Sequence, residues 1–437
     1  MFVLACAAST ASAIEVTGKV IGSQGEKVVV EIETASGIQR GDTVLFSTEV
    51  AGRKLEAGRG TVIRVGQDEV DVSLSSGRAN VGMSARIELQ RFVHECDTIA
   101  AIPDDLNAVA QGVYPEMLDT ARAISVCREA TKLYPEEARF HAQLGRSYMQ
   151  SDQMGRAILS FERAIGIQPD YAAALHNLAS ILHFGPEELR NDPRARSYFL
   201  KAAEQDFYAS MPIIGTMCRH GIGGEINHEV SAYWFSQAAE NDDPSAQNAL
   251  AECYENGWGL EKDLTSALIW YRSSAEQKHP PALRNMGRVF HRGIGVERNP
   301  QRAITWYEEA ASLGDAEARY TLSNIFIEGI DALRDTSKAF DLLKLSAKSE
   351  YLPALKKLSE IHLQGTLVKR DYDQAAGYLK QAALLGDPAA QYQFGAMAEK
   401  GQGTDRDKNL AIEMYRRAAR QDHAKAQERL TRLKQTW

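Results

Sequence analysis

The pattern of hydrophobic and polar residues divides the chain into two kinds of structure. Between residues 14 and 91, polar and apolar residues alternate with a period of two, and glycines interrupt the alternation. This alternation is typical of short strands, of which the clearest lie at 28–32, 44–46 and 70–74. From residue 119 onward, apolar residues recur at the three- and four-residue intervals of a helix face. The sequence therefore predicts a small β domain followed by a long helical part.

The strand-rich segment contains an internal repeat. The stretch GKVIGSQGEKVVVEI from Gly18 parallels GTVIRVGQDEVDVSL from Gly60, and a glycine turn follows each copy, at Gly41 or Gly82. Two such strand-turn-strand units predict a small all-β, barrel-like domain over residues 14–91, because closure leaves few unpaired strand edges.

The next segment is predicted to be a linker followed by one helix. The sequence AIPDDLNAVAQGVYPEM has the composition of a loop. Asp119 then supplies a helix cap, and Pro135 ends the helix after Tyr134.

The remaining helical part is periodic, with a spacing of 36 residues. Glycines keep this spacing at Gly185, Gly221, Gly257, Gly293, Gly329, Gly365 and Gly401. Large side chains keep it at Tyr198, Trp234, Trp270, Trp306, Leu342, Tyr378 and Met414. Independent classes of residue that share one period indicate a solenoid of repeated helix pairs.

One unit, residues 282–314, shows why this sequence forms a helix pair. Apolar residues such as Met286 form a stripe along the first helix, and Gly293 ends that helix where a left-handed residue is favoured. Asn299 and Pro300 supply the cap and the first turn of the second helix. A single pair cannot bury its apolar face alone, so its stability depends on stacked neighbours.

The second helix of each pair is expected to turn small and aromatic residues toward the core. In the same unit these are Ala303, Trp306 and Tyr307. Because Trp234, Trp270 and Trp306 share one slot, we expect them to pack between repeats rather than to bind a sugar.

Upstream of these units the spacing is 34 residues, as in tetratricopeptide repeats. Pro135-Glu136-Glu137-Ala138 recurs as Pro169-Asp170-Tyr171-Ala172. The predicted organisation is an export-signal remnant (1–13), a β-barrel-like domain (14–91), a linker and first helix (92–136), a tetratricopeptide-like repeat (137–172), seven 36-residue repeats (173–423) and a capping helix (424–437).

The 36-residue unit resembles the Sel1-like repeat family, whose members are relatives of tetratricopeptide repeats. The resemblance rests on Met286-Gly287, Gly293-Ile294-Gly295-Val296, Asn299, Ala303 and Trp306-Tyr307 and extends from Ala174 onward. It implies a mainly α fold, an α/α superhelical solenoid, and a role as an adaptor or regulator, often periplasmic in bacteria. The later units depart from the pattern, since Gly329-Ile330-Asp331 and Gly365-Thr366-Leu367 lack the second glycine.

Cysteine usage adds a second resemblance. The segment around Cys96 and Cys127 is similar to the one that precedes such repeats in exported bacterial proteins, which implies a Cys96–Cys127 disulfide. Cys218 and Cys253 lie on neighbouring first helices, where either a second, less favoured bridge or two buried free thiols would fit.

Charge and hydropathy narrow the choice of partner and compartment. A formal charge of −8 and a pI near 5.8 argue against a nucleic-acid partner, and no apolar run is long enough for a transmembrane span. Residues 1–13, MFVLACAASTASA, end in an A-x-A motif similar to a signal-peptidase site, which predicts a periplasmic or secreted protein. If these residues are an ordinary terminus, the protein is cytoplasmic.

The first helix of each pair is expected to line the concave face of the solenoid. By similarity to tetratricopeptide repeats, the third, seventh and tenth positions, with the alanine counted as the first, should point into the groove. The partner-binding candidates are Glu252, Glu255, Arg284, Arg288, His291, Tyr320, Asn324, Lys356 and Glu360. The arginines are the best anchor because their forked donors suit carboxylates. Alternatively, these charges pair between repeats on a solvated face.

No catalytic motif is visible, so we expect neither enzyme activity nor a cofactor. The sequence lacks a nucleophile elbow, a Walker loop and a zincin motif, and His176 and His183 lack the further ligands of a metal site. The leading hypothesis is a non-enzymatic scaffold of the bacterial cell envelope that binds a protein or peptide. The alternative is an envelope enzyme or ligand-binding protein acting on peptidoglycan or a related small molecule.

Overall fold

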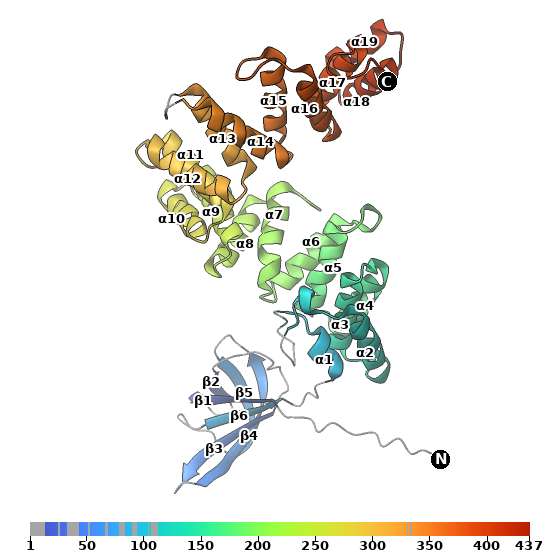
Figure 1. Cartoon of the computed structure of the whole chain (residues 1–437). Helices are drawn as coiled ribbons and strands as arrows, with labels where there is room; N and C mark the ends of the chain where they lie inside the picture. Colours follow the sequence, from blue (N-terminus) through green and yellow to red (C-terminus); the bar gives the residue numbers. More distant parts are fainter. Residues whose placement is uncertain are drawn as a thin grey trace, which may run out of the picture. The chain divides into compact units, whose positions relative to one another are not determined.

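The computed structural model describes residues 14–24, 27–32, 43–50, 53–65, 69–77, 84–89, 94–103, 105, 112–329, 331–332 and 334–437 (Figure 1). The predicted signal remnant and the turns at Gly41 and Gly82 lie outside these residues. The chain divides into two compact units, Met1–Trp234 and Phe235–Trp437.

The first unit begins with strands. They are β1 (Ile14–Gln24), β2 (Lys27–Ile32), β3 (Thr43–Val50), β4 (Arg53–Val65), β5 (Glu69–Gly77) and β6 (Ser84–Leu89). Neighbouring strands are antiparallel and pair in the closed order β1-β2-β5-β4-β3-β6. Val20, Val28, Val30 and Val72 are buried. The alternation in the sequence therefore reflects strands with one covered face.

The helices that follow in the first unit are α1 (Glu95–Ala100), α2 (Thr120–Leu133), α3 (Ala138–Gln150), α4 (Met154–Ile167), α5 (Ala172–Phe184), α6 (Asp192–Ala203) and α7 (Met211–His220), and α8 (His228–Glu240) contains the boundary between the units. Short 3₁₀ turns lie at η1 (Pro115–Met117), η2 (Glu187–Leu189) and η3 (Tyr208–Ser210).

The second unit continues with α9 (Pro244–Asn256), α10 (Leu264–Glu276), α11 (Pro280–Arg292), α12 (Pro300–Ser312), α13 (Ala316–Glu328), α14 (Thr336–Lys348), α15 (Leu352–Gln364), α16 (Tyr372–Leu384), α17 (Pro388–Lys400), α18 (Lys408–Ala419) and α19 (Ala424–Arg432). Within each unit, helix hairpins follow one another in chain order (Figure 1). The predicted α solenoid of stacked hairpins is confirmed.

The predicted helix ends are confirmed in the repeat of residues 282–314. Gly293 follows α11 with a φ of 72°, and the side chain of Asn299 accepts a hydrogen bond from the Arg302 amide at 3.0 Å at the start of α12. Aspartates cap other helices of the second unit in the same way: Asp243, Asp263, Asp315, Asp335, Asp371, Asp387 and Asp407. These local contacts place each hairpin turn.

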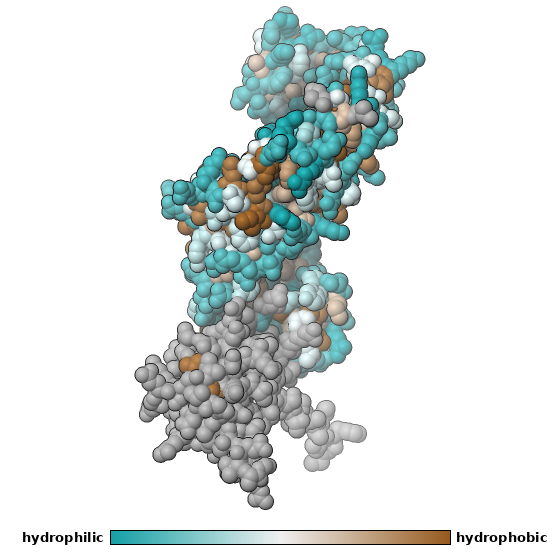
Figure 2. Space-filling model, turned by 90° about the vertical axis from the view of Figure 1, so that its left-hand side faces the viewer, coloured by the Kyte–Doolittle hydropathy of each residue, from teal (hydrophilic) through white to brown (hydrophobic). Residues whose placement is uncertain are grey.

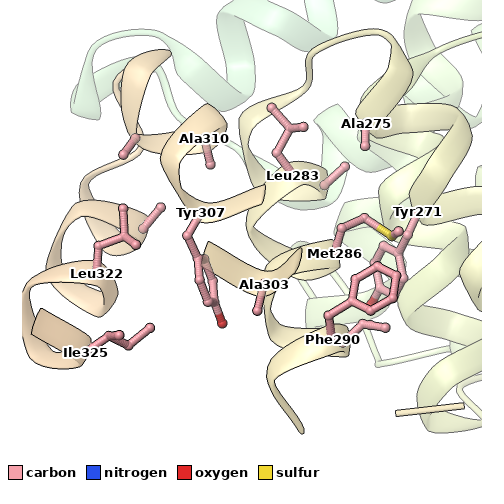
Figure 3. Close-up of a cluster of buried hydrophobic side chains, with 14 of the residues drawn as sticks. Tyr271, Ala275, Leu283, Met286, Phe290, Ala303, Tyr307, Ala310, Leu322 and Ile325 are labelled. Atoms are coloured by element: carbon pink, nitrogen blue, oxygen red, sulfur yellow. The ribbon is translucent and has the colours of Figure 1, made fainter. Parts of the chain in front are cut away.

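A contiguous apolar core lies between the hairpins of α10 to α13 (Figure 3). Tyr271 and Tyr307 are fully buried in it, whereas Trp270 and Trp306 pack against it from a partly exposed position. The prediction that the tryptophans pack between repeats is therefore confirmed, although the fully inward positions of this core belong to the tyrosines that follow them. The helix is rotated so that the tyrosine in the following position points inward, and Gly287 gives the Tyr307 ring its place. A Cβ atom on Gly287 would lie 2.6 Å from Tyr307 Cδ1.

One helix was not predicted. Residues 95–100 form α1, which begins with a reciprocal cap between His94 and Asp97: His94 N donates to Asp97 Oδ2 at 2.8 Å, and Cys96 N donates to the His94 ring at 3.0 Å. The helix is only one and a half turns long, so its sequence carries no readable periodicity.

The surface of the helical part is mostly hydrophilic on the face that Figure 2 displays, with hydrophobic residues in small areas between. None of the helices in the described residues is long and apolar enough to cross a membrane.

Candidate partner-binding site

The predicted binding residues lie on the first helices α9, α11, α13 and α15, all in the second unit. Most of them already have partners within the chain. The structure therefore separates the candidates into a group that connects neighbouring repeats and a group that borders an open groove.

A two-pronged connection between repeats joins Arg288 to Glu255. Arg288 Nη1 and Nη2 donate to the two carboxylate oxygens of Glu255, each at 2.6 Å, and Tyr271 Oη donates to the same carboxylate at 2.8 Å. Burial acts to raise the pKa of Glu255, but the hydrogen bonds from Arg288 and Tyr271 outweigh it and lower the pKa. The triad links α9, α10 and α11.

The other two residues of the predicted cluster, Arg284 and His291, also contact carboxylates. Arg284 Nη1 donates to Asp315 Oδ2 at 2.5 Å, and Asp315 also caps α13. His291 Nε2 lies 2.8 Å from Asp331 Oδ2, and Arg298 donates to the other carboxylate oxygen of Asp331. Each member of the cluster thus contacts a carboxylate of a neighbouring hairpin.

Glu252 belongs to a smaller polar network. Its carboxylate accepts a hydrogen bond from Asn248 at 3.1 Å and one from Asn285 at 3.4 Å, and Asn285 also donates to Asn248 Oδ1 at 2.9 Å. These contacts, like those of Arg284 and Arg288, are those expected of charges that pair between repeats. A partner-binding role for the cluster stays a prediction.

The remaining candidates border a groove of about 760 Å³ on the first helices α13, α15 and α17. Tyr320, Lys356 and Glu360 line it, together with Tyr392 from the next repeat. Lys356 Nζ donates to Asp387 at 3.1 Å, and Glu360 accepts from Gln364 at 3.0 Å. Asn324 is half-buried on α13 and does not line the groove.

Sequence analysis missed the apolar floor of this groove, which includes Leu363, Leu379, Ala396 and Met397. A signal was present in the repeat. Glu255 and Tyr271 occupy the equivalent positions three repeats earlier, since each lies 108 residues before its counterpart, Leu363 or Leu379. The polar pair is lost at Leu363 and Leu379, and at Ile327 and Leu343 one repeat earlier.

The cysteines show one bridge. Cys96 and Cys127 form a disulfide that joins α1 to α2, as the resemblance implied. Cys218 and Cys253 are buried and do not form a disulfide, so the less favoured second bridge is wrong and the alternative of two buried thiols is confirmed. Cys218 Sγ instead accepts a hydrogen bond from Arg196 of α6 at 3.4 Å.

The histidines of the first unit serve local contacts. His176 Nδ1 lies 2.8 Å from Ser210 Oγ, and burial lowers the pKa of His176 to about 4. His183 contacts Asp192 at 2.6 Å. Within the described part of the chain, no three His, Cys, Asp or Glu side chains come together as they would to hold a metal ion.

Comparison with known proteins identifies the repeats. The tetratricopeptide repeat model matches residues 138–171, and the Sel1 repeat model matches residues 172–207, 214–243, 244–279, 280–315, 316–351, 352–387 and 388–423. No curated protein matches the chain.

Two solved structures of bacterial proteins are similar to this chain. The protective antigen c5321 of uropathogenic Escherichia coli is 26% identical, with a TM-score of 0.49, over 71% of this chain and 67% of that one. A Sel1 repeat protein from Oxalobacter formigenes is 24% identical, with a TM-score of 0.50, over 71% of this chain and 90% of that one. Because the Sel1 repeat matches together cover more than half of its residues, the chain belongs to the Sel1 repeat family.

Proposed function

We propose that the chain is a non-enzymatic adaptor of the bacterial cell envelope that binds a protein partner along the first helices of its Sel1 repeats. Repeat scaffolds of this kind generally serve protein interaction, because stacked hairpins present an extended surface. The observation that carries the proposal is the groove on α13, α15 and α17. It combines an apolar floor with exposed polar side chains, as binding sites do.

An envelope location is supported by the Cys96–Cys127 disulfide. Disulfides persist in oxidising compartments and are rare in the cytoplasm. We propose further that β1 to β6 form a barrel-like domain that gives the partner a second contact. Cell fractionation with sequencing of the mature amino terminus tests the location, and recovery of the reduced chain from the cytoplasm would overturn it.

Site-specific photo-crosslinking tests the binding face. A photoreactive amino acid at Gln393, which is exposed and lines the groove, should give one defined protein adduct in living cells. The matched control is Gln381, which is also exposed but lies on the second helix α16 and does not line the groove. Equal adducts at both positions, or none at either, would contradict the proposal. Turnover of peptidoglycan fragments by the purified chain would favour the enzyme hypothesis instead.

A further inference from the structure

The groove lies over slots that in two other repeats are covered by an arginine side chain. In the repeat of α9 and α10, the slots at Glu255 and Tyr271 are polar, and Arg288 covers them from 33 residues downstream. The same arrangement returns in the last full repeat, that of α17 and α18. Two guanidinium groups, from different positions, thus close equivalent slots.

In the last full repeat, Tyr415 Oη donates to Glu399 Oε2 at 2.8 Å. Arg429 covers this pair from 30 residues downstream, with Nε donating to Glu399 Oε2 at 3.0 Å. The bonds from Arg429 and Tyr415 lower the pKa of Glu399. Burial acts in the opposite direction and is outweighed.

In the repeat of α15 and α16, the same slots hold Leu363 and Leu379, and both covering positions are changed. The position 33 residues after Leu363 is Ala396, and the position 30 residues after it is Gln393. Both line the groove, and neither can bring a cation over the two leucines. The floor is therefore apolar and open, whereas the equivalent slots at Glu255 and Tyr271 and at Glu399 and Tyr415 are polar and covered by an arginine.

The rim of the groove is cationic in an acidic chain. Lys356, Lys357 and Lys400 line it, against the single carboxylate of Glu360. Lys356 is paired with Asp387, whereas neither Lys357 nor Lys400 forms an ion pair with a described residue. With a formal charge of −8 on the whole chain, this excess of positive charge is local. It favours carboxylates directly beside an apolar contact.

We infer that this groove binds an extended segment of a partner protein in which a large apolar side chain is flanked by aspartate or glutamate. The apolar side chain lies on Leu363, Leu379 and Ala396, and the carboxylates face Lys357 and Lys400. The volume of about 760 Å³ accommodates several side chains of such a segment. This inference rests on the proposed adaptor function and adds the chemistry of the partner.

The test is selection of a displayed library of random twelve-residue peptides on the full chain, followed by affinity measurement with the enriched peptides. We expect the enriched sequences to combine Leu, Ile, Phe or Trp with neighbouring acidic residues, and we expect their affinity to fall as salt rises. Ala396→Arg, which places a guanidinium at the position equivalent to Arg288, the residue that closes the repeat before its own, should weaken binding at least tenfold. Gln393→Arg, which copies the reach of Arg429, should act in the same direction.

The matched control is Gly377→Arg on α16, where nothing lies within 4 Å of an added Cβ atom, and it should leave binding unchanged. The double change Lys357→Glu with Lys400→Glu should remove the acidic preference and reverse the salt dependence. A neutral or basic consensus, no enrichment, or affinity that is unaffected by both Ala396→Arg and Gln393→Arg would overturn the inference. The proposed adaptor function fails separately, if the crosslinker at Gln393 captures no partner in cells.

Discussion

The triad of Glu255, Tyr271 and Arg288 allows a quantitative test of how one repeat holds the next. We predict that Glu255→Leu destabilises its repeat, that Tyr271→Leu does the same, and that the two changes together cost less than their sum. The double change copies Leu363 and Leu379, a pair that the fold already accepts. The comparison therefore distinguishes two cases. Either the polar pair itself stabilises the repeat, or only the removal of one member destabilises it, because the other is then buried without its partner.

The magnitude follows from burial. Without Glu255, the hydroxyl of the fully buried Tyr271 loses its acceptor, which costs about 1–3 kcal/mol. The Arg288 side chain is 27% exposed and can turn to water, so the loss of its ion pair adds only about 0–1 kcal/mol. Glu255→Leu should then destabilise the repeat by about 1–4 kcal/mol. The double change removes both buried polar groups, and the coupling should recover at least about 1 kcal/mol.

Native-state hydrogen exchange of the full chain is the appropriate assay. Repeats contact mainly their neighbours, so the loss is local and a single melting temperature would not report it. Amides of α9 to α11 should exchange about 30-fold faster in Glu255→Leu for a loss of about 2 kcal/mol. Amides of α17 and α18, which hold the intact Glu399–Tyr415 pair, are the internal reference. Strictly additive single and double changes would refute the reasoning.

The same triad gives a pH dependence with a defined sign. The folded state lowers the pKa of Glu255, so its ionised carboxylate stabilises the fold above the ordinary pKa of a glutamate. That stabilisation is lost as the pH falls through the lowered pKa of the folded state. The exchange difference between the native chain and Glu255→Gln should therefore be present at neutral pH and vanish in acid.

Three further predictions concern other parts of the chain. Replacing Cys96 and Cys127 by serine opens a loop with a sequence separation of 31 residues and should lower the free energy of unfolding by about 3–4 kcal/mol. The loss should be measured as faster hydrogen exchange of the amides in α1 to α3, and unchanged exchange would contradict the prediction. Gly287→Ala should destabilise by about 1–3 kcal/mol because the added Cβ atom meets a tyrosine ring at 2.6 Å. Gly377→Ala, with open space around the added methyl group, should stabilise the chain by about 0.5–1 kcal/mol. Equal effects of the two glycine substitutions on the free energy of urea unfolding would show that local packing does not determine their outcome. His176 should titrate near pH 4 in nuclear magnetic resonance spectra. Acidification from about pH 6.5 toward 4 should destabilise its helix, because only the unfolded state binds a proton at His176 in that window. A titration midpoint near 6.5 would contradict the burial of this side chain.

The sequence by itself determined the helix pairs and their ends. The 36-residue spacing predicted the hairpins, and Gly293 and Asn299 predicted where one helix stops and the next begins, because these signals act within a few residues. The disulfide between Cys96 and Cys127 came from a resemblance rather than from geometry, and the structure contains it.

Tertiary structure decided which side chain of each stripe reaches the core and which charges find partners. Periodicity identifies the inner face of a helix only to within one position, so Trp306 and Tyr307 could not be ranked until the neighbouring Gly287 fixed the packing. The contact between Arg288 and Glu255 joins residues 33 apart on separate hairpins, and its existence depends on how the hairpins stack. For the same reason the groove over Leu363 was hidden, because an open surface arises from what two neighbouring repeats fail to fill.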